Sequence, residues 1–341
     1  MRVNSGLINE IKILEEVNSF SKHERLVQGI INAIDQKIIS RGDILPSVNQ
    51  MIKEFSYARE TIVKAYKELI TRGIIESKNR RGYFVATEDT DQHLKVCLLL
   101  FAFDTFQETF YQSFRNQLGE NVHLDIFFHH NNPQIFETII KDIKGKYGMY
   151  VIAPIPNKAS VALLEELPMN KFLMVDRFLK LRDDHSYIVQ EFEKSSYEAF
   201  ASLAPRIKEF EEFVFFFKPS SAEPNEVLKS FKKLVKDYNI NGTIKNSYEP
   251  GSIEVGKVYF TIHNLELWQI LKDTKTKGLQ VGKDLGILSH NDDDVKEIIF
   301  DGITTFSVDF ADMGRMAAEF VLSKKPVKVV MKNQLIRRNS L

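Results

Sequence analysis

The sequence predicts an α/β protein with a winged helix-turn-helix at its N-terminus and a two-lobed parallel α/β domain behind it. Two amphipathic helical patterns and a basic-tipped hairpin come first, and a short polar stretch follows. Apolar runs of strand length then alternate with helical patterns to the end of the chain. These changes of pattern predict a winged-helix domain over residues 1–86, a linker over residues 87–93 and a two-lobed domain over residues 94–341.

Two short helices form the centre of the first domain. Pro46 and Ser47 favour a helix start, because proline fits the turn and the serine side chain can cap a free backbone amide. An apolar stripe at helical spacing covers residues 48–55, and a second stripe begins after Arg59. Gly73 permits the left-handed backbone that commonly ends a helix. The pattern therefore predicts two helices joined by a tight turn.

A further helix is expected before this pair, over residues 23–39, and Arg41 to Asp43 should end it. Residues 1–22 contain a short amphipathic pattern carried by Leu7, Ile8, Ile11 and Leu14. That pattern fits either a local cap on the domain or a contact between two copies of the chain, and the sequence leaves both open.

A basic hairpin follows the helix pair. Residues 74–77 and 83–85 are expected to be strands, and residues 78–82 form a basic loop between them. An ordinary helix pair with a solvated loop is the alternative, but a strand-flanked Arg-Arg-Gly favours the winged form. In that form the second helix enters a DNA major groove and the wing contacts the backbone or the minor groove. Arg59, Glu60, Thr61 and Lys64 are then the base-edge candidates, and Arg80 and Arg81 the phosphate contacts.

The stretch from Leu45 to Val85 resembles the DNA-binding domain of GntR-type transcription regulators. The positions that carry the resemblance are Leu45, Pro46, Ser47, Arg59, Thr61, Leu69, Gly73, Gly82 and Val85. The sequence departs from the family at Ala58, where serine is usual, and at Val63, where a second basic residue is common. The resemblance implies that Ser47, Asn49, Arg59, Thr61, Arg81 and Gly82 contact DNA, and Lys64 partly replaces the missing basic residue.

Composition is consistent with a DNA-binding head on a larger body. The 341 residues are 43% apolar, which suffices for two or three domains. The net charge is zero, but residues 1–86 hold 14 basic and 10 acidic side chains, whereas residues 87–341 hold 32 and 36. The single cysteine, Cys97, excludes a disulfide framework. With no leader pattern and no long apolar run, we expect a soluble cytoplasmic protein without a membrane partner.

The rear domain has the alternation of βαβ units. The expected strands cover residues 95–101, 123–128, 149–153, 171–175, 213–217, 258–262 and 285–289. The expected helices lie around residues 110–118, 133–147, 157–166, 224–238, 264–276 and 309–323. This pattern predicts two α/β lobes of about 100 to 130 residues, with the chain crossing between them near residues 190–200 and 289–308.

Polar pairs follow five of the expected strands. They are Asp104, His129 with His130, Asp176 with Arg177, His263 with Asn264, and Asn291 with Asp292. Any single pair fits a solvated turn or a helix cap. Open α/β sheets bind ligands at the carboxyl ends of their strands, however, so five coincident ends favour a site for a small polar ligand.

Residues 278–340 resemble the C-terminal half of LacI-type, periplasmic-binding-protein-like effector domains, and residues 95–341 do so loosely. The positions that carry the resemblance are Gly278, Val281, Asp284, Asp292, Thr304, Thr305, Met313, Gly314, Ala317, Arg338 and Ser340, with Gly282 in place of a proline. It implies a monosaccharide effector, such as fucose or arabinose, bound between the two lobes. The expected ligand-binding residues are Asp104, Phe110, His129, Arg177, Asn225, His263, Asn264 and Asn291. Trp268 is interpreted as core packing rather than as a stacking surface.

The sequence points away from an enzyme. It contains no G-x-S-x-G, P-loop, H-E-x-x-H or C-x-x-C motif, and His129 and His130 stand without an obvious reaction partner. The acidic run at residues 291–294 lacks the spacing of a calcium loop, so we expect neither metal nor cofactor. The hypothesis is a homodimeric transcription regulator, a repressor, that binds operator DNA under control of a sugar. The alternative is a DNA-binding regulator whose rear domain only dimerises or binds a metabolite other than a sugar.

Overall fold

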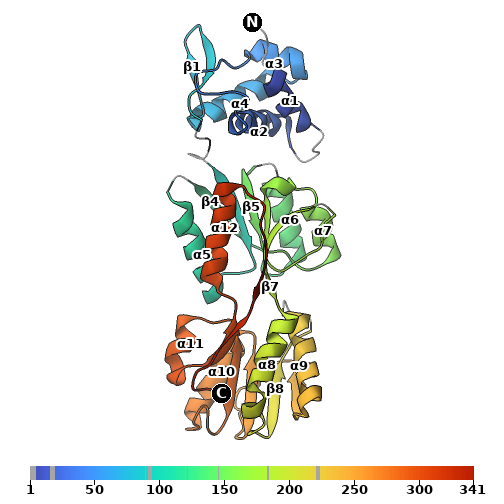
Figure 1. Ribbon diagram of the computed structural model, residues 1–341, viewed down its shortest axis with the longest axis vertical. Helices are drawn as coiled ribbons and strands as arrows, with labels where there is room; N and C mark the ends of the chain where they lie inside the picture. The colour runs from blue at the N-terminus through green and yellow to red at the C-terminus, as the bar shows by residue number, and fades with distance from the viewer. Residues whose placement is uncertain are drawn as a thin grey trace. The chain divides into compact units, whose positions relative to one another are not determined.

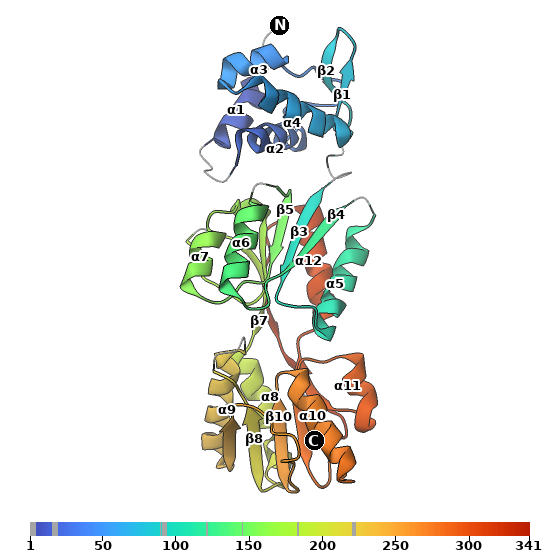
Figure 2. The same cartoon turned by 180° about the vertical axis from the view of Figure 1, so that it is seen from behind.

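The computed structural model describes residues 5–15, 20–88, 90, 94–120, 122–144, 146–182, 184–219 and 223–341. Of the expected linker, residues 89 and 91–93 lie outside the described part. The chain forms two compact units. The first comprises residues 1–102, 114–187 and 316–327, and the second comprises residues 103–113, 188–315 and 328–341. Figures 1 and 2 show the head and two layered α/β assemblies from opposite sides.

The head is a winged helix-turn-helix, as predicted. Its elements are α1 (Ser5–Ile13), α2 (Lys22–Asp35), α3 (Val48–Phe55), α4 (Arg59–Thr71), β1 (Ile75–Lys78) and β2 (Gly82–Val85). The two strands pair antiparallel, with Lys78 opposite Gly82, and form the wing. A single apolar core holds all of these elements together, with Met51, Tyr66 and Leu69 completely buried.

Capping side chains determine where the head helices begin. Ser47 caps α3 by accepting a hydrogen bond from the amide of Gln50, whose side chain bonds the Ser47 amide in return. Ser21 and Glu24 form the same reciprocal cap on α2. Ala58 begins α4 without a side-chain cap, so the departure from the family pattern at this position removes one capping bond.

Helix α1 belongs to the head core. Leu7, Ile8 and Ile11 are buried in it, and α1 packs against α2, where a β-carbon added at Gly29 would lie 2.5 Å from Ile11 Cγ1. Of the two interpretations left open by the sequence, the structure therefore shows the local cap. The expected helix over residues 23–39 was too long: α2 ends at Asp35, because the chain then turns and the amides of Ile38 and Ile39 both donate to the Ala33 carbonyl.

The first unit contains most of a six-stranded sheet with the order β13-β7-β6-β5-β3-β4. Its strands are β3 (Lys95–Leu100), β4 (His123–Phe128), β5 (Met149–Ile152), β6 (Phe172–Asp176), β7 (Ser186–Glu191) and β13 (Lys328–Lys332). The central pairs β4–β3, β3–β5 and β5–β6 are parallel. Helices α6 (Pro133–Ile143) and α7 (Lys158–Leu164) lie on one face, and α5 (Thr105–Leu118) and α12 (Phe310–Ser323) on the other (Figures 1 and 2).

The second unit is built around a sheet with the order β14-β12-β11-β10-β8-β9. Its strands are β8 (Glu212–Phe216), β9 (Gly242–Lys245), β10 (Lys257–Thr261), β11 (Gly286–His290), β12 (Thr304–Ser307) and β14 (Gln334–Ile336). All pairs are parallel except β12–β14. Its helices are α8 (Glu193–Ile207), α9 (Asn225–Tyr238), α10 (Asn264–Thr276) and α11 (Asp294–Ile298).

Side-chain alternation in β8 explains how this sheet is covered on both faces. Phe213 and Phe215 pack with residues of α8 and α9 in one aromatic cluster. Val214 and Phe216 point the other way and pack with residues of α10. Trp268 is partly buried against that second cluster, in agreement with its interpretation as core packing.

The predicted crossing near residues 289–308 is wrong. Those residues continue the second unit as the end of β11, α11 and β12, so the chain changes units at residues 315–316 and 327–328 instead. The sequence patterns do not predict β7, α8, β9 or β13. They do predict a C-terminal strand that returns to pair, and β14 pairs antiparallel with β12. No described helix is long and apolar enough to cross a membrane.

Two glycines with left-handed backbone give a matched test of packing. A β-carbon at Gly282 (φ 83°) would lie 2.1 Å from the backbone oxygen of Asn339, whereas one at Gly278 (φ 66°) has no atom within 4 Å. We expect Gly278→Ala to lower the free energy of unfolding by about 1 kcal/mol, the cost of a left-handed alanine. Gly282→Ala should lower the free energy of unfolding by roughly 1–3 kcal/mol more, because the added methyl group overpacks the contact with Asn339. Urea unfolding of both variants measures the difference, and equal midpoints would contradict the close contact.

Candidate DNA-binding surface and effector-site residues

The start of α3 and the start of α4 together form one exposed polar surface on the head. Ser47, Asn49 and Arg59 are all exposed. The Arg59 guanidinium donates a 3.0 Å hydrogen bond from Nη1 to Asn49 Oδ1, so a residue of α3 orients the first residue of α4. Thr61, two positions after Arg59 in the same helical turn, is half-buried. The structure thus brings four of the predicted DNA contacts to the same end of the helix pair.

The wing presents its two arginines to solvent. Arg80 has a left-handed backbone (φ 59°), Gly82 has φ 105°, and the Arg81 amide donates to the Lys78 carbonyl to close the loop. Both arginine side chains are exposed. Gly82 permits the tight return of the chain into β2, which explains its place in the motif.

Lys64 lies in a different environment from Arg59. It shares one side of α4 with Glu68 and Arg72, which follow at helical spacing, and these three residues line a cavity of about 290 Å³ together with Lys146 and Tyr147. DNA contact by Lys64 stays a prediction, but the structure groups this lysine with the inner side of the head.

His129 has a structural environment at the end of β4. The residue is 2% exposed, its Nε2 bonds the Ala153 carbonyl at 3.1 Å, and its Nδ1 accepts the Asn131 amide at 3.1 Å. Burial lowers the pKa of His129 to about 4 against the opposing effect of the Ala153 bond, and His130 lowers it further. Both ring nitrogens of His129 are therefore hydrogen-bonded, and the neutral imidazole connects the end of β4 to the end of β5. Ligand contact by this residue stays a prediction.

Three further candidates, from the end of β6 and the start of α5, differ in their access to solvent. Arg177 is half-buried at the end of β6, directly after Asp176, whose backbone is left-handed (φ 66°). Phe110 on α5 is only 3% exposed, so its ring packs inside the protein. Asp104, by contrast, is exposed, and its carbonyl accepts the Glu108 amide at the start of α5.

A buried lysine organises the end of β11 in the second unit. Lys296 is 1% exposed, and its Nζ donates to the carbonyls of His290 (3.0 Å) and Asn291 (2.7 Å). Burial lowers the pKa of Lys296 to about 8, and Asp293 and Asp292 oppose that effect. Asn291 is held in a left-handed conformation (φ 60°) with its side-chain oxygen buried and without a partner among the described residues. This amide oxygen is the clearest unsatisfied acceptor at the predicted effector residues.

Asp292 has a structural partner. Its carboxylate receives two hydrogen bonds from Arg338, at 2.6 and 2.8 Å, and one from Thr305 at 2.7 Å. Burial alone would raise the pKa of Asp292, but the bonds from Arg338 and Thr305 hold it below its usual value. The motif residues that support the LacI-type resemblance therefore fix the loop after β11.

Glu223 is a candidate that the sequence analysis missed. Its side chain is 4% exposed, accepts the Lys218 amide at 2.7 Å and lies 3.3 Å from Nε2 of His263. His263 precedes α10, and the half-buried Asn264 is its first residue. Asn225 is exposed at the start of α9. No pattern in the sequence marks Glu223, because its burial results from contacts between distant segments.

Thr105 connects the start of α5 to the loop after β11. Its hydroxyl donates to Asp293 Oδ2 at 2.8 Å, which places the neighbouring Asp104 beside the Asn291 loop within the second unit. These two candidates are thus brought together. No group of histidine, cysteine and carboxylate side chains suited to a metal ion is found among the described residues.

Comparison with known proteins identifies both parts of the chain. Residues 22–85 match the family of bacterial regulatory proteins named gntR, and residues 260–341 match the periplasmic binding protein-like domain. The chain therefore carries a GntR-type helix-turn-helix domain at its N-terminus and a periplasmic-binding-protein-like domain at its C-terminus. No protein among the curated sequences matches it.

Solved structures of LacI family regulators share the fold of the rear domain. A regulator from Lactobacillus casei with bound glucose has a TM-score of 0.62 and 12% identity, with 72% of this chain and 99% of that chain covered. A regulator from Silicibacter pomeroyi has a TM-score of 0.60 and 16% identity over 72% and 98%. The trehalose repressor from Escherichia coli has a TM-score of 0.60 and 11% identity over 71% and 99%. At these identities the similarity shows the fold.

The depressed pKa of His129 predicts acid sensitivity. The unfolded chain takes up a proton near pH 6.5, whereas folded His129 does so only near pH 4, so its contribution to stability is present above pH 6.5 and lost as the pH falls toward 4. Between pH 7 and pH 5 this loss is about 2 kcal/mol. Urea unfolding at both pH values should show that the free energy of unfolding falls less in His129→Gln than in wild type. In His130→Gln, a change at the exposed neighbour, it should fall nearly as much as in wild type. Identical losses in wild type and His129→Gln would contradict this assignment.

Proposed function

We propose that this transcription regulator, which joins a GntR-type helix-turn-helix domain to a periplasmic-binding-protein-like effector domain, represses its target by binding operator DNA and is controlled by a monosaccharide. The exposed Arg59–Asn49 pair beside the arginine-tipped wing is the observation that carries the proposal. It presents a fork of guanidinium donors at the start of α4, where a recognition helix meets base edges.

The head has the two kinds of contact that operator recognition needs. Arg59 can bond guanine O6 and N7 in the major groove, and its bond to Asn49 reduces the number of conformations that it must give up on binding. Arg80 and Arg81 on the wing can neutralise phosphates, which adds affinity without sequence preference. A homodimer would present two such heads to a palindromic operator.

The strand ends of the rear domain support a polar effector. Asn291 carries a buried amide oxygen that has no partner in the part of the chain that the structure describes, and Asn264 and Arg177 are half-buried at other strand ends. Amide and guanidinium groups discriminate sugar hydroxyls through paired hydrogen bonds. The structural relatives from Lactobacillus casei and Arthrobacter sp. FB24 contain glucose and lactose, which supports a sugar here as well. Among sugars we favour a pentose or deoxyhexose such as arabinose or fucose.

Effector control follows from differential binding. A sugar that binds one arrangement of the effector domain more tightly than another shifts the population toward it, and operator affinity changes by no more than that difference in affinity. A rear domain that only dimerises would give no such response. A panel of monosaccharides therefore discriminates the two hypotheses.

Substitutions at two arginines should separate base recognition from phosphate contact. Arg59→Ala should weaken binding to an operator selected from random DNA by about 10- to 100-fold and relax its specificity. Arg81→Ala should weaken selected and unselected DNA alike and reduce the slope of log affinity against log salt by about 1. Fluorescence anisotropy at several salt concentrations measures both. Lys141→Ala, an exposed change on α6, is the control; unchanged specificity in Arg59→Ala would exclude base contact.

Asn264→Ala tests the effector site. A sugar at about 100 times its dissociation constant should add roughly 2.7 kcal/mol to the stability of the wild-type protein, which appears as a rise of a few degrees in Tm. The variant should lose most of this rise and keep its operator affinity without sugar. The matched control is Gln280→Ala, an exposed change before β11, at the opposite end of that strand from Asn291. A full sugar response in Asn264→Ala would remove this residue from the site.

A further inference from the structure

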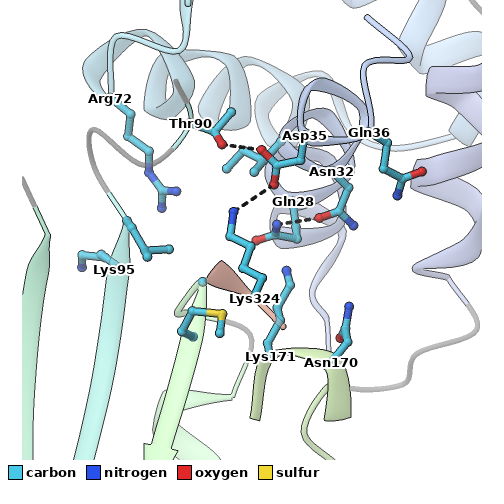
Figure 3. A pocket seen from close by; sticks show the side chains of 14 residues that line it. Gln28, Asn32, Asp35, Gln36, Arg72, Thr90, Lys95, Asn170, Lys171 and Lys324 are labelled. Atoms are coloured by element: carbon cyan, nitrogen blue, oxygen red, sulfur yellow. Dashed lines mark hydrogen bonds and ion pairs between the residues drawn. The ribbon is translucent and has the colours of Figure 1, made fainter. Parts of the chain in front are cut away.

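A second polar cavity lies in the first unit, where α2 and α4 of the head meet the ends of β3 and β5. Its volume is about 240 Å³. The head contributes Gln28, Asn32 and Asp35 from α2, and also Arg72, the residue directly after α4. Figure 3 shows these side chains across from Lys95, Asn170, Lys171 and Lys324, which come from the α/β part of the unit.

The lining is strongly basic. Arg72, Lys95, Lys171 and Lys324 face a single carboxylate, that of Asp35. Asp35 accepts hydrogen bonds from Lys324 Nζ, at 3.3 Å, and from the Thr90 hydroxyl, and Arg72 is paired with Glu68 on α4. Neither Lys95 nor Lys171 forms an ion pair with a carboxylate among the described residues, although Lys95 is close enough to Asp125 to lower the pKa of that carboxyl.

Lys171 is the least satisfied of these groups. It ends the short 3₁₀ helix at Met169–Lys171 and is 8% exposed. Its Nζ has no hydrogen-bond partner among the described residues and lies 5.8 Å from the centre of the Phe20 ring. Burial lowers the pKa of Lys171 to about 7, Lys324 lowers it further and Asp35 opposes the change. A buried ammonium group without an acceptor is costly, and an anion beside it would remove that cost.

We propose that this cavity is a second effector site, which binds a small dianion of the phosphate type. Lys171 and Lys95 supply the charge, and Arg72 and Lys324 extend the basic lining on either side. The amides of Gln28, Asn32 and Asn170 supply further hydrogen-bond donors at the rim. The volume admits a single phosphate group with part of the molecule that carries it.

The location of this site gives the anion a regulatory role. It joins side chains of the DNA-binding head to Lys95, at the start of β3, and to Lys171, just before β6. It also competes with Asp35 for Lys324, which directly follows α12. Anion binding therefore changes how firmly the head is held against the rest of its unit, independently of the sugar response proposed above.

Inorganic phosphate is the first probe. The Tm of the full-length protein is followed during a phosphate titration at constant ionic strength. We expect a saturable rise in wild type, a loss of affinity of roughly tenfold or more in Lys171→Met, and a weaker but clear loss in Lys95→Met. Lys141→Met on the exposed surface of α6 is the matched control and should bind as wild type does. No saturable rise in wild type, or equal affinities in wild type and both pocket variants, overturns the proposal.

The pH dependence gives an independent check. Sulfate keeps its charge between pH 6 and pH 8, whereas Lys171 loses its proton as the pH rises through about 7. The charged fraction falls from about nine-tenths to about one-tenth, so sulfate affinity should fall roughly tenfold from pH 6 to pH 8 in wild type. The fall should be absent in Lys171→Met. A wild-type affinity that does not change with pH would overturn the assignment of Lys171.

A parallel titration with glucose 6-phosphate distinguishes the source of the anion. If glucose 6-phosphate binds more tightly than inorganic phosphate, the ligand is a phosphorylated metabolite. If the two bind equally, the ligand is free phosphate; both results support the site. The sugar-induced rise in Tm should be the same in Lys171→Met and wild type. Failure at this site can thus be separated from failure of the proposed sugar response.

Discussion

The two-point ion pair between Asp292 and Arg338 is the interaction on which the second unit depends. It joins the loop after β11 to the C-terminal segment, where Ser340 accepts the Thr304 amide and donates to the Ile287 carbonyl. The same loop carries Asn291, whose buried amide oxygen faces no described donor. A rigid support of this kind is what a hydrogen-bonding effector site requires, because a loosely held amide discriminates poorly between ligands.

Most of the fold follows from local patterns that are visible in the chain. Helices with serine caps and apolar stripes, and strands with continuous apolar runs, lie close to where those signals place them, and α3 is an example. Two of the strands that were not predicted lack such signals: β9 is half exposed and β13 alternates exposed with half-buried positions, because both lie at sheet edges. Helix α8, by contrast, has an apolar stripe at Phe200, Leu203, Ala204 and Ile207 that is visible in the sequence. Polar site residues such as Glu223 and Lys171 could not be predicted, since their burial results from contacts between distant segments.

Helix α4 serves two surfaces of the head. Its first residue, Arg59, points with Asn49 to the predicted DNA side, whereas Lys64, Glu68 and the following Arg72 line cavities on the inner side. The residue expected to read bases therefore begins a helix of 13 residues, and Arg72, which lines the proposed anion site, directly follows that helix. A helix of this length moves as a unit, so an event on its inner side reaches its outer side without an intermediate loop.

Helix α12 spans a point at which the chain passes from one unit to the other. Residues 310–315 of this helix belong to the second unit and residues 316–323 to the first, and the next residue, Lys324, contacts Asp35 of the head. Its fourteen residues span about 21 Å and include no proline, but Gly314 lies in the helix directly before the boundary at residues 315–316. Glycine weakens a helix interior more than any residue except proline, so the least stable turn of α12 lies where the chain changes units.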